Sequence, residues 1–378
     1  MRSAEVAIIG AGVTGVSIAL RLRERGIGPV VVLDRSGVNA GASGVQPGGV
    51  RRQWSTREHC LLADESYRYY LHFGAHVQAT ARPRFDACGY LFLAHSAEKL
   101  SQLAANVELQ NTLGVPSEII APERVEEILP GADLRSLTGG AWCASDGYFD
   151  QPQAVVESFA EAAWQAGAEL EIAEVLELSR DGEHWRLRLP GSELRARHVV
   201  LAAGYDSAAL SAPLGLELPI VKEQRFLFLS QPVRERLLEP LVISAERRFA
   251  AKQLANGRVL ASDLTATGDP ERGRDRWRAT VRAGVEELTP LLTFVGFDLL
   301  IDGFYDVTPD HEEILGPVPG LPGLWLATGF SGHGFMMAPA VGRALAAWIA
   351  GDHPGEAAAS FTLDRFERGG LQVETQVV

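Results

Sequence analysis

The sequence predicts a mixed α/β fold with two domains, one built on a parallel sheet and one mainly antiparallel. Three observations lead to this prediction: a glycine-rich turn between an apolar strand and a helix near the N-terminus, similar strand–glycine segments far downstream, and aromatic strands between them. The length of 378 residues also suits two domains, because single domains usually have about 100–200 residues.

Composition excludes several classes of protein. Hydrophobic residues make up 46% of the chain and charged residues 22%, which excludes disordered, collagen-like and coiled-coil proteins. The net charge of -13 argues against nucleic acid as a partner, because phosphate binding needs a basic field. Cys60, Cys88 and Cys143 form neither a disulfide framework nor a metal knuckle, which predicts a reducing, cytoplasmic location. The apolar runs 291–301 and 344–350 are too short to span a membrane, so no span is expected.

The clearest motif joins an apolar strand over residues 5–9 to a helix over 16–25 through the glycine-rich turn 10–15. A second strand over 30–33 ends in Asp34, nineteen residues after the last glycine of the turn. Strand, glycines, helix, strand and acidic residue in this order are typical of a dinucleotide-binding βαβ unit.

Each residue type in this motif has a physical reason. Gly10 permits a tight turn, Gly12 lets the backbone approach a pyrophosphate, and Gly15 lets the helix lie close to the strand. The helix N-terminus offers N–H groups to phosphate oxygens. Asp34 can accept hydrogen bonds from a ribose diol and would repel a 2′-phosphate, so NADP is disfavoured. The motif alone does not distinguish NAD from FAD.

Two more glycine-rich segments follow directly. The small-residue loop 41–44 and the turn 48–49, which precedes Arg51 and Arg52, predict backbone that lies against a flat or phosphorylated ligand. A flexible surface loop with solvated arginines is the alternative. A capping-box pattern over 55–58 predicts the start of a helix.

The downstream segments look like the second half of a nucleotide-binding domain. A helix over 154–166 and strands over 170–172, 175–178 and 185–189 precede an apolar strand that ends at Gly204.

A last strand over 324–329 leads through a glycine-rich turn into a helix over 335–349. This order repeats the anion-binding geometry of the first motif. A serine–histidine nucleophile built from Ser331 and His333 is disfavoured, because the surrounding sequence is not G-x-S-x-G.

Two stretches of different character lie between these segments. Residues 81–144 and 217–311 contain aromatic and alternating strands. An Asn-Gly pair at 256–257 predicts a two-residue hairpin between strands over 249–253 and 258–261, and therefore antiparallel pairing.

The order of these motifs resembles one family. Together with Asp146–Asp150, 302–310 and the Thr-Gly-Phe-Ser-Gly-His-Gly-Phe block at 328–335, they resemble the FAD-dependent amine and D-amino acid oxidoreductases of the sarcosine oxidase, glycine oxidase and dimethylglycine dehydrogenase type. The resemblance spans nearly the whole chain, and the block at 328–335 is its most specific part. It implies a Rossmann-like FAD-binding domain of the glutathione-reductase-like type and a mainly antiparallel substrate domain. The implied division assigns 1–80, 145–216 and 312–378 to the FAD-binding domain, and 81–144 and 217–311 to the substrate domain.

The resemblance also implies the residues of the site. Arg51 or Arg52 would dock a substrate carboxylate, Tyr305 would either reach the substrate or belong to the core, and His333 lies beside the flavin. No metal is expected, because the other histidines fall in no ligand spacing. The implied cofactor-binding residues are Gly10, Gly12, Val13, Thr14, Gly15, Asp34, Arg35, Ala42, Ser43, Val175, Ala203, Gly204, Gly332, His333, Gly334, Phe335 and Met336.

The chain departs from the family pattern at several positions. The stretch that holds a flavin-linking cysteine in monomeric sarcosine oxidases corresponds to residues 303–305 here, which include no cysteine. His59 lies a few residues from the position of the flavin-linking histidine of related dehydrogenases. Non-covalent FAD is therefore expected, with a link to His59 left open. A carboxylate-binding lysine of sarcosine oxidases aligns with Met336, which puts sarcosine itself in doubt. A lysine implicated there in oxygen reactivity aligns near Leu260.

The implied reaction is the oxidation of a secondary, N-methyl or D-amino acid, with hydride transfer to flavin N5 and hydrolysis of the imine product. The electron acceptor would be oxygen or another molecule. Two alternatives stay open: an FAD-dependent 2-hydroxy acid dehydrogenase with His333 as its base, and an FAD subunit of a hetero-oligomeric amine dehydrogenase that needs a partner subunit. Lys222, Arg225 and Lys252 either line the site or are solvated, and strand alternation favours solvation for two of the three.

Overall fold

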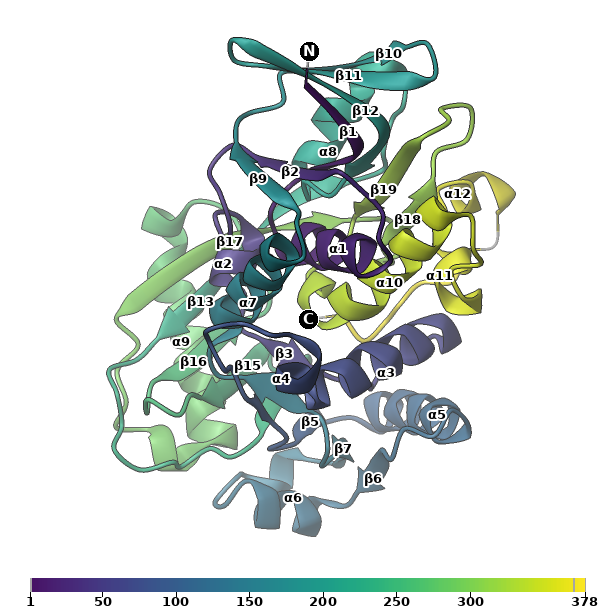
Figure 1. Cartoon of the computed structure of the whole chain (residues 1–378). Coiled ribbons are helices and arrows are strands. Elements are labelled where there is room, and N and C mark those ends of the chain that lie inside the picture. The colour runs from purple at the N-terminus through teal and green to yellow at the C-terminus, as the bar shows by residue number, and fades with distance from the viewer. Residues whose placement is uncertain (1, 370, 378) are drawn as a thin grey trace.

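The computed structural model describes residues 2–369 and 371–377 and contains two large sheets and one small sheet (Figure 1). The central strands of the first sheet run parallel in the order β19-β12-β1-β2-β9, whereas β10, β11 and β18 pair antiparallel at its margins. Its strands are β1 (Arg2–Ile9), β2 (Val30–Asp34), β9 (Glu169–Ile172), β10 (Glu177–Asp181), β11 (His184–Leu189), β12 (Ser192–Leu201), β18 (Ile314–Pro317) and β19 (Leu324–Thr328).

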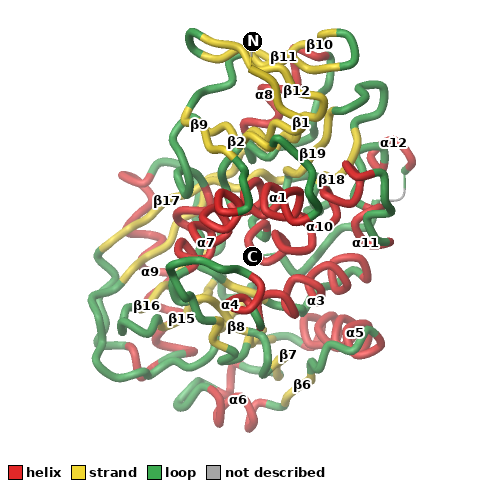
Figure 2. Tube along the Cα trace, viewed as in Figure 1, coloured by secondary structure: helices red, strands yellow, loops and turns green. Residues whose placement is uncertain are grey.

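Both faces of the first sheet are buried, which explains its nearly continuous apolar strands. Val6 and Ile8 pack into a layer of helices, whereas Ile9 and Leu33 face the opposite side together with Trp185. Figure 2 shows this layer of helices beneath β1 and β2. The layer consists of α1 (Val13–Glu24), α3 (Arg57–Leu71), α7 (Pro152–Gln165) and α10 (Gly334–Ala350).

The second sheet has the strand order β17-β13-β16-β15-β14-β5-β7-β6. All its pairs are antiparallel except β14 with β5. Its outer face packs against α9 (Pro270–Leu288) through Trp277 and Val281. The strands are β5 (Tyr90–Ala94), β6 (Glu118–Ile120), β7 (Gly139–Cys143), β13 (Val221–Leu229), β14 (Leu241–Ser244), β15 (Phe249–Gln253), β16 (Val259–Asp263) and β17 (Leu299–Val307).

The small sheet has the strand order β3-β8-β4. The remaining elements are β3 (Gly49–Val50), β4 (Phe85–Asp86), β8 (Gly147–Phe149), α2 (Ala42–Val45), α4 (Phe73–His76), α5 (Ala97–Thr112), α6 (Pro122–Ile128), α8 (Asp206–Ser211), α11 (Glu356–Ser360), α12 (Arg365–Arg368) and the 3-10 turns Leu134–Ser136, Ala212–Leu214 and Pro290–Leu292.

The predicted mixed α/β fold is confirmed, and the structure corrects three local details. The hairpin of β15 and β16 exists, but its last ladder pair joins Gln253 to Val259, so the loop is longer than the two residues predicted. The strand expected from Val175 begins only at Glu177, which leaves Val175 in a loop. The predicted capping box is not formed: α3 has Thr56 rather than Ser55 as its N-cap, and the Thr56 side chain makes no capping hydrogen bond.

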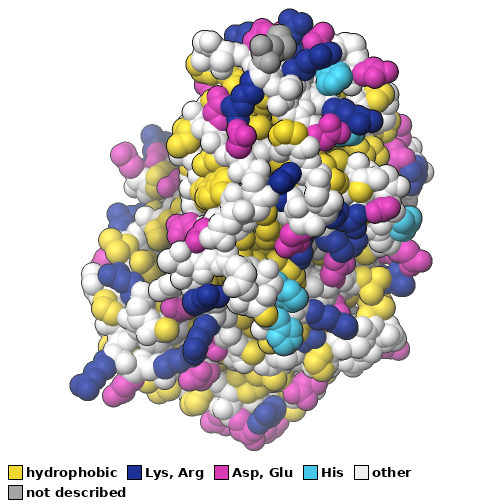
Figure 3. Space-filling view, in the orientation of Figure 1, with side chains coloured by type: hydrophobic (Ala, Val, Ile, Leu, Met, Phe, Trp, Pro, Cys, Tyr) yellow, Lys and Arg dark blue, Asp and Glu magenta, His cyan; other side chains and the backbone are white. Residues whose placement is uncertain are grey.

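The surface gives no sign of a concentrated charge on the face drawn in Figure 3, where acidic and basic side chains are interspersed. Among the described residues, no helix combines the length and the apolar character that crossing a membrane would require.

Candidate active site

A cavity of about 650 Å³ lies between the first sheet and one face of the second. On one side it is lined by residues at or just after the carboxyl ends of the parallel strands, including Gly10, Asp34 and Ala203. On the other side it is lined by residues of β13, β15, β16 and β17. The carboxyl ends of parallel strands are the usual position for a ligand in such sheets.

The glycine turn brings bare backbone to the cavity wall. Gly10 has φ +115°, and a Cβ there would lie 2.3 Å from the carbonyl oxygen of Ala202. A Cβ at Gly12 would lie 3.1 Å from Ser43 Oγ, which accepts a hydrogen bond from the Val13 N–H. Only glycine fits both positions without displacing a neighbour. The N-terminus of α1 therefore opens directly onto the cavity, as phosphate binding requires.

Asp34 lies at the end of β2 with its carboxylate held by backbone N–H groups. Its Oδ1 accepts from Ser36 and Gly37, and its Oδ2 accepts from Ala11 at 2.8 Å. A carboxylate oxygen can accept two hydrogen bonds, so Oδ2 keeps one lone pair for a ribose hydroxyl.

The structure brings almost all of the sequence-predicted site residues together around this cavity. Two of them, Gly15 and Arg52, do not line it. Those that do are Gly10, Gly12, Val13, Thr14, Asp34, Arg35, Ala42, Ser43, Arg51, Val175, Ala203, Gly204, Tyr305, Gly332, His333, Gly334, Phe335 and Met336.

Gly15 and Arg52 have structural surroundings instead. A Cβ at Gly15 would lie 1.9 Å from the carbonyl oxygen of Gly10, so Gly15 allows α1 to pack on the turn. The buried Arg52 guanidinium donates from Nε to Asp146 at 3.0 Å, and its backbone N–H donates to the same carboxylate. Arg52 is therefore not placed to dock a substrate.

Arg51 and Lys252 are buried cations on the cavity wall. The Arg51 guanidinium donates to the carbonyl oxygens of Gln53 and Gln376 and stacks 3.6 Å from the ring centre of Trp54. Lys252 Nζ donates to the carbonyl oxygen of Pro47 and lies 3.8 Å from the ring centre of Tyr148. Within the described part of the chain, neither forms a salt bridge with a carboxylate. Burial lowers the pKa of Lys252 to about 7.

Strand alternation gave the wrong expectation for the basic residues of the second sheet. Lys222 is exposed, but both Arg225 and Lys252 line the cavity. The resemblance to sarcosine oxidases aligns a lysine implicated there in oxygen reactivity with apolar sequence near Leu260. Lys252 lies directly opposite Leu260 on the neighbouring strand. The signal that could have found it is the cross-strand pair in the predicted hairpin.

Tyr305 and Arg225 lie on the adjacent strands β17 and β13. Arg225 lies 5.4 Å from the ring centre of Tyr305 and pairs with Glu223 at 2.5 Å. The ring of Tyr305 is so close to the turn before α10 that a Cβ at Gly332 would lie 2.3 Å from it. Burial raises the pKa of Tyr305, so it remains protonated at neutral pH.

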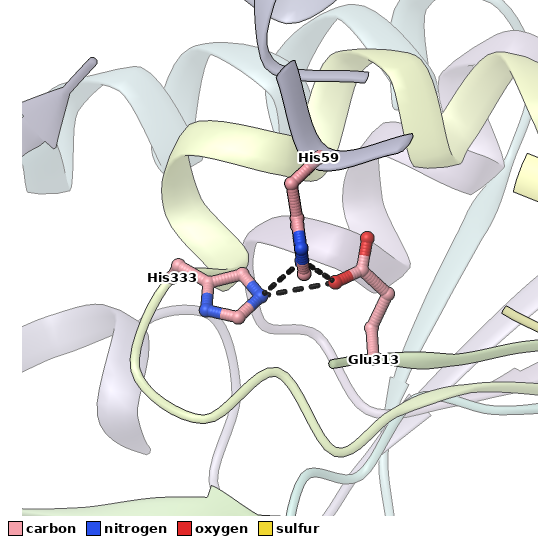
Figure 4. A group of neighbouring side chains, drawn as sticks. All are labelled: His59, Glu313 and His333. Carbon is pink, nitrogen blue, oxygen red and sulfur yellow. Dashed lines mark hydrogen bonds and ion pairs between the residues drawn. The ribbon is translucent and has the colours of Figure 1, made fainter. Parts of the chain in front are cut away.

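A buried cluster that the sequence did not reveal lies behind this turn (Figure 4). Glu313 Oε2 is 2.9 Å from Nε2 of both His59 and His333, and the two Nε2 atoms are 3.2 Å apart. The three residues are far apart in sequence, so no spacing could have shown the cluster. The nearest signal is the adjacent pair Glu312-Glu313 after a strand.

His59 lies outside the cavity lining. It is fully buried, with Nδ1 3.1 Å from Thr56 Oγ1 and Nε2 engaged in the cluster. Within the described residues, neither His59 nor any cysteine lines the cavity.

The C-terminal segment completes the site. Glu374 accepts hydrogen bonds from the backbone N–H groups of Ser55 and Thr56, and thereby supplies the cap of α3 that the capping box was expected to supply. Two residues later, the Gln376 carbonyl holds Arg51, and Val377 lines the cavity.

Comparison with known proteins decides the family. Residues 5–348 match the family model described as FAD dependent oxidoreductase. The chain belongs to this FAD-dependent oxidoreductase family. The glycine turn, Asp34 and the long cavity fit the cofactor, whose diphosphate and ribose need the N–H groups and carboxylate that these residues present.

Several relatives match nearly the whole of this chain, but some of them are much longer proteins. The chain is 25% identical to 4-methylaminobutanoate oxidase (formaldehyde-forming) of Paenarthrobacter nicotinovorans over 95% of this chain and 45% of that protein. It is 26% identical to mitochondrial dimethylglycine dehydrogenase of Rattus norvegicus over 93% of this chain and 43% of that protein. The chain thus spans less than half the length of these relatives. The structure of L-proline dehydrogenase from P. horikoshii superposes with a TM-score of 0.89 and 27% identity, over 98% of this chain and 100% of that one.

We expect Glu374→Gln to destabilise the protein by about 1–2 kcal/mol, because the α3 N-terminus loses an anionic cap. Although burial opposes it, the His59 charge and the hydrogen bonds from Ser55 and Gln376 lower the pKa of Glu374 below its usual 4.5. A carboxyl group whose pKa is lower in the folded than in the unfolded protein stabilises the fold at any pH above its unfolded-state pKa. This stabilisation is lost as the pH falls through its folded-state pKa.

Urea unfolding of wild type and Glu374→Gln at several pH values measures this difference. It should be largest near neutral pH and shrink below about pH 4.5. Glu356→Gln is the matched control, because Glu356 is an exposed acidic residue in the first turn of another helix. Equal losses in the two variants would contradict the capping role of Glu374.

Proposed function

We propose that this chain oxidises an amine that carries a carboxylate, such as a secondary, N-methyl or D-amino acid. One observation carries the proposal: Arg51 and Lys252 are buried on the cavity wall without a carboxylate partner among the described residues. Unpaired buried cations are unfavourable, and an anionic substrate would neutralise them. The named relatives support the amine, since 4-methylaminobutanoate, dimethylglycine and L-proline all combine an amine with a carboxylate.

The proposed division of labour follows the two sheets. The first sheet, within 1–80, 145–216 and 312–378, would hold FAD as a glutathione-reductase-like domain, and the second, within 81–144 and 217–311, would cover the substrate. Bound FAD supplies the acceptor for the hydride of the substrate C–H bond, and the imine product then hydrolyses in water. Non-covalent binding of FAD is proposed because His59 is engaged elsewhere.

Arg51 is the residue that we assign to the substrate carboxylate. Its guanidinium is already oriented by two carbonyl oxygens and by the ring of Trp54, so little conformational entropy remains to be lost on binding. The apolar side chains of Tyr90, Leu241 and Ile243 line the same cavity and would exclude water from the reacting atoms.

The direct test is the visible spectrum of the FAD-loaded chain under anaerobic conditions while candidate substrates are added. Bleaching of the flavin bands by a secondary, N-methyl or D-amino acid would establish the proposed reaction and its substrate class. Bleaching only by 2-hydroxy acids would overturn it in favour of alcohol oxidation. Bands that respond to no substrate but bleach with dithionite would contradict activity of the chain by itself and point to a partner subunit.

For the substrate that bleaches the flavin, Arg51→Gln should raise KM by roughly 30-fold or more, because loss of one partner of a buried charge pair costs about 2–5 kcal/mol. The control is the same substrate as its carboxamide, for which wild type and variant should have similar KM values. An unchanged KM for the acid would exclude Arg51 as its docking group. FAD content of both proteins, measured from absorbance, shows whether the variant still folds.

Lys252 should influence reoxidation by oxygen, because a cation beside the cavity stabilises the negative charge that oxygen acquires on reduction. Lys252→Met should slow reoxidation by oxygen about tenfold or more but leave reoxidation by a neutral dye nearly unchanged. Because the pKa of Lys252 is about 7, its charge is present below that pH and lost above it. Stopped-flow reoxidation should therefore slow as the pH rises past about 7 in wild type but not in the variant; parallel pH profiles would contradict this role.

A further inference from the structure

His333 has one ring nitrogen that is bound and one that is not. Its Nε2 lies 2.9 Å from Glu313 Oε2, whereas Nδ1 is buried and has no hydrogen-bond partner among the described residues. His333 is only 2% exposed and lines the cavity in the turn that begins α10. An unpartnered buried ring nitrogen is unfavourable unless a ligand completes it.

The hydrogen bonds of the cluster determine which nitrogen carries the proton. The Glu313 carboxylate is ionised: although burial opposes it, the His59 charge and the hydrogen bonds from both imidazoles hold the pKa of Glu313 far below its usual range. An ionised carboxylate can only accept, so the Nε2 atoms of His59 and His333 must both donate to it. Both histidines therefore carry a hydrogen on Nε2.

The two histidines differ in charge. Although burial opposes it, the Glu313 charge and hydrogen bond, with Glu374 and Glu312 nearby, raise the pKa of His59, so His59 pairs with Glu313 as a cation. Burial lowers the pKa of His333 by more than Glu313 raises it. His333 is then the neutral partner, with a hydrogen on Nε2 and a lone pair on Nδ1.

Trp54 holds the two rings in place. It stacks on His59 at a centroid distance of 5.0 Å and an interplanar angle of 21°, and it meets His333 edge-on at 5.0 Å and 67°. The charged and titratable groups that surround His333 and its partners come from α3, the turn before β18, β17, the segment after β3 and the C-terminal segment: His59, Glu312, Glu313, Tyr305, Arg51 and Glu374.

We propose that Glu313 positions His333 as the proton-accepting group of the FAD site: Nδ1 takes up one proton when the cavity gains the negative charge of the two-electron-reduced cofactor. This rests on the FAD-dependent oxidation proposed above. In that reaction the substrate C–H bond breaks, its hydride leaves with both electrons, and the N–H proton that the resulting iminium group releases is the one that Nδ1 receives. A new negative charge nearby raises the pKa of an imidazole by about 1–3 units and so favours uptake of a proton at Nδ1.

The test is the ¹⁵N spectrum of histidine-labelled, FAD-loaded protein before and after reduction with dithionite, between about pH 6 and about pH 8. His333 is identified by the signals that disappear in His333→Asn. We expect Nδ1 to give the signal of a bare ring nitrogen in the oxidised protein and of a protonated nitrogen after reduction. A Nδ1 that stays bare after reduction would overturn the proposal, as would a stoichiometric metal ion at the cluster, which would need the Nε2 lone pairs.

Variants separate the positioning role of Glu313 from a merely structural one. Glu313→Gln should give a mixture of the two neutral tautomers of His333 and abolish proton uptake at Nδ1. Glu312→Gln is the matched control and should leave the tautomer and the proton uptake unchanged, because Glu312 approaches His59, at 3.6 Å, and not His333. If Glu313→Gln does not fold, His333→Asn gives a second readout, since it changes no charge in the oxidised protein. This variant should bind reduced FAD in preference to oxidised FAD about tenfold less strongly than wild type does. The measurable result is a more negative midpoint potential of the bound flavin. An unchanged potential would contradict the role of His333.

Reduction by dithionite keeps this test independent of the substrate proposal. Failure of every amine to bleach the flavin would count against the proposed substrate, whereas a bare Nδ1 in the chemically reduced protein would count against His333 alone.

Discussion

The buried ion pair between Arg52 and Asp146 fixes the chain next to Arg51, which lies on the cavity wall. Asp146 accepts from both the backbone N–H and the side chain of Arg52, and it lies in the connection between β7 of the second sheet and β8 of the small sheet. Side chains of successive residues in an extended segment point in opposite directions. With Arg52 fixed on one side, Arg51 faces the cavity. Removing both charges of such a pair from water costs free energy, so the pair contributes more to the positions of the neighbouring side chains than to the stability of the fold.

The C-terminal segment depends on the same arrangement. Gln376 reaches Arg51 through its carbonyl oxygen, and Glu374 caps the helix that carries His59. The segment is anchored upstream by Arg365, which forms a bidentate pair with the buried Asp310. Residues from both ends of the chain therefore meet around Arg51, and a site of this kind can form only after most of the fold has assembled.

The sequence was sufficient for the parts of the site that local geometry determines. At Gly10 and Gly12 a Cβ would collide with Ala202 or crowd Ser43, so the need for glycine can be read from the turn itself. The strand–turn–helix order around His333 is local in the same way. For this reason the mixed α/β fold and the glycine-lined end of the cavity could be predicted.

The rest depends on contacts that sequence spacing does not contain. Strand alternation favoured solvation for two of Lys222, Arg225 and Lys252, but α9 covers one face of the second sheet and the other face forms the cavity wall. Neither face is therefore simply exposed to solvent. The capping box failed because Glu374, far away in sequence, takes the place of Glu58. The backbone N–H groups at a helix start need acceptors in either case, but only the tertiary structure shows which distant residue supplies them.

The buried cations of the molecule divide into two groups by their partners. Arg52 and Arg365 pair with buried carboxylates, and His59 pairs with Glu313, so their charges are neutralised within the protein. Arg51 and Lys252 instead rest on aromatic rings and carbonyl oxygens, which stabilise a cation without cancelling its charge. The paired cations Arg52, Arg365 and His59 stabilise contacts within the fold. The cations Arg51 and Lys252, which have no carboxylate partner among the described residues, therefore supply the positive potential of the cavity. Within the cavity this potential favours a small anion over a neutral molecule of the same shape.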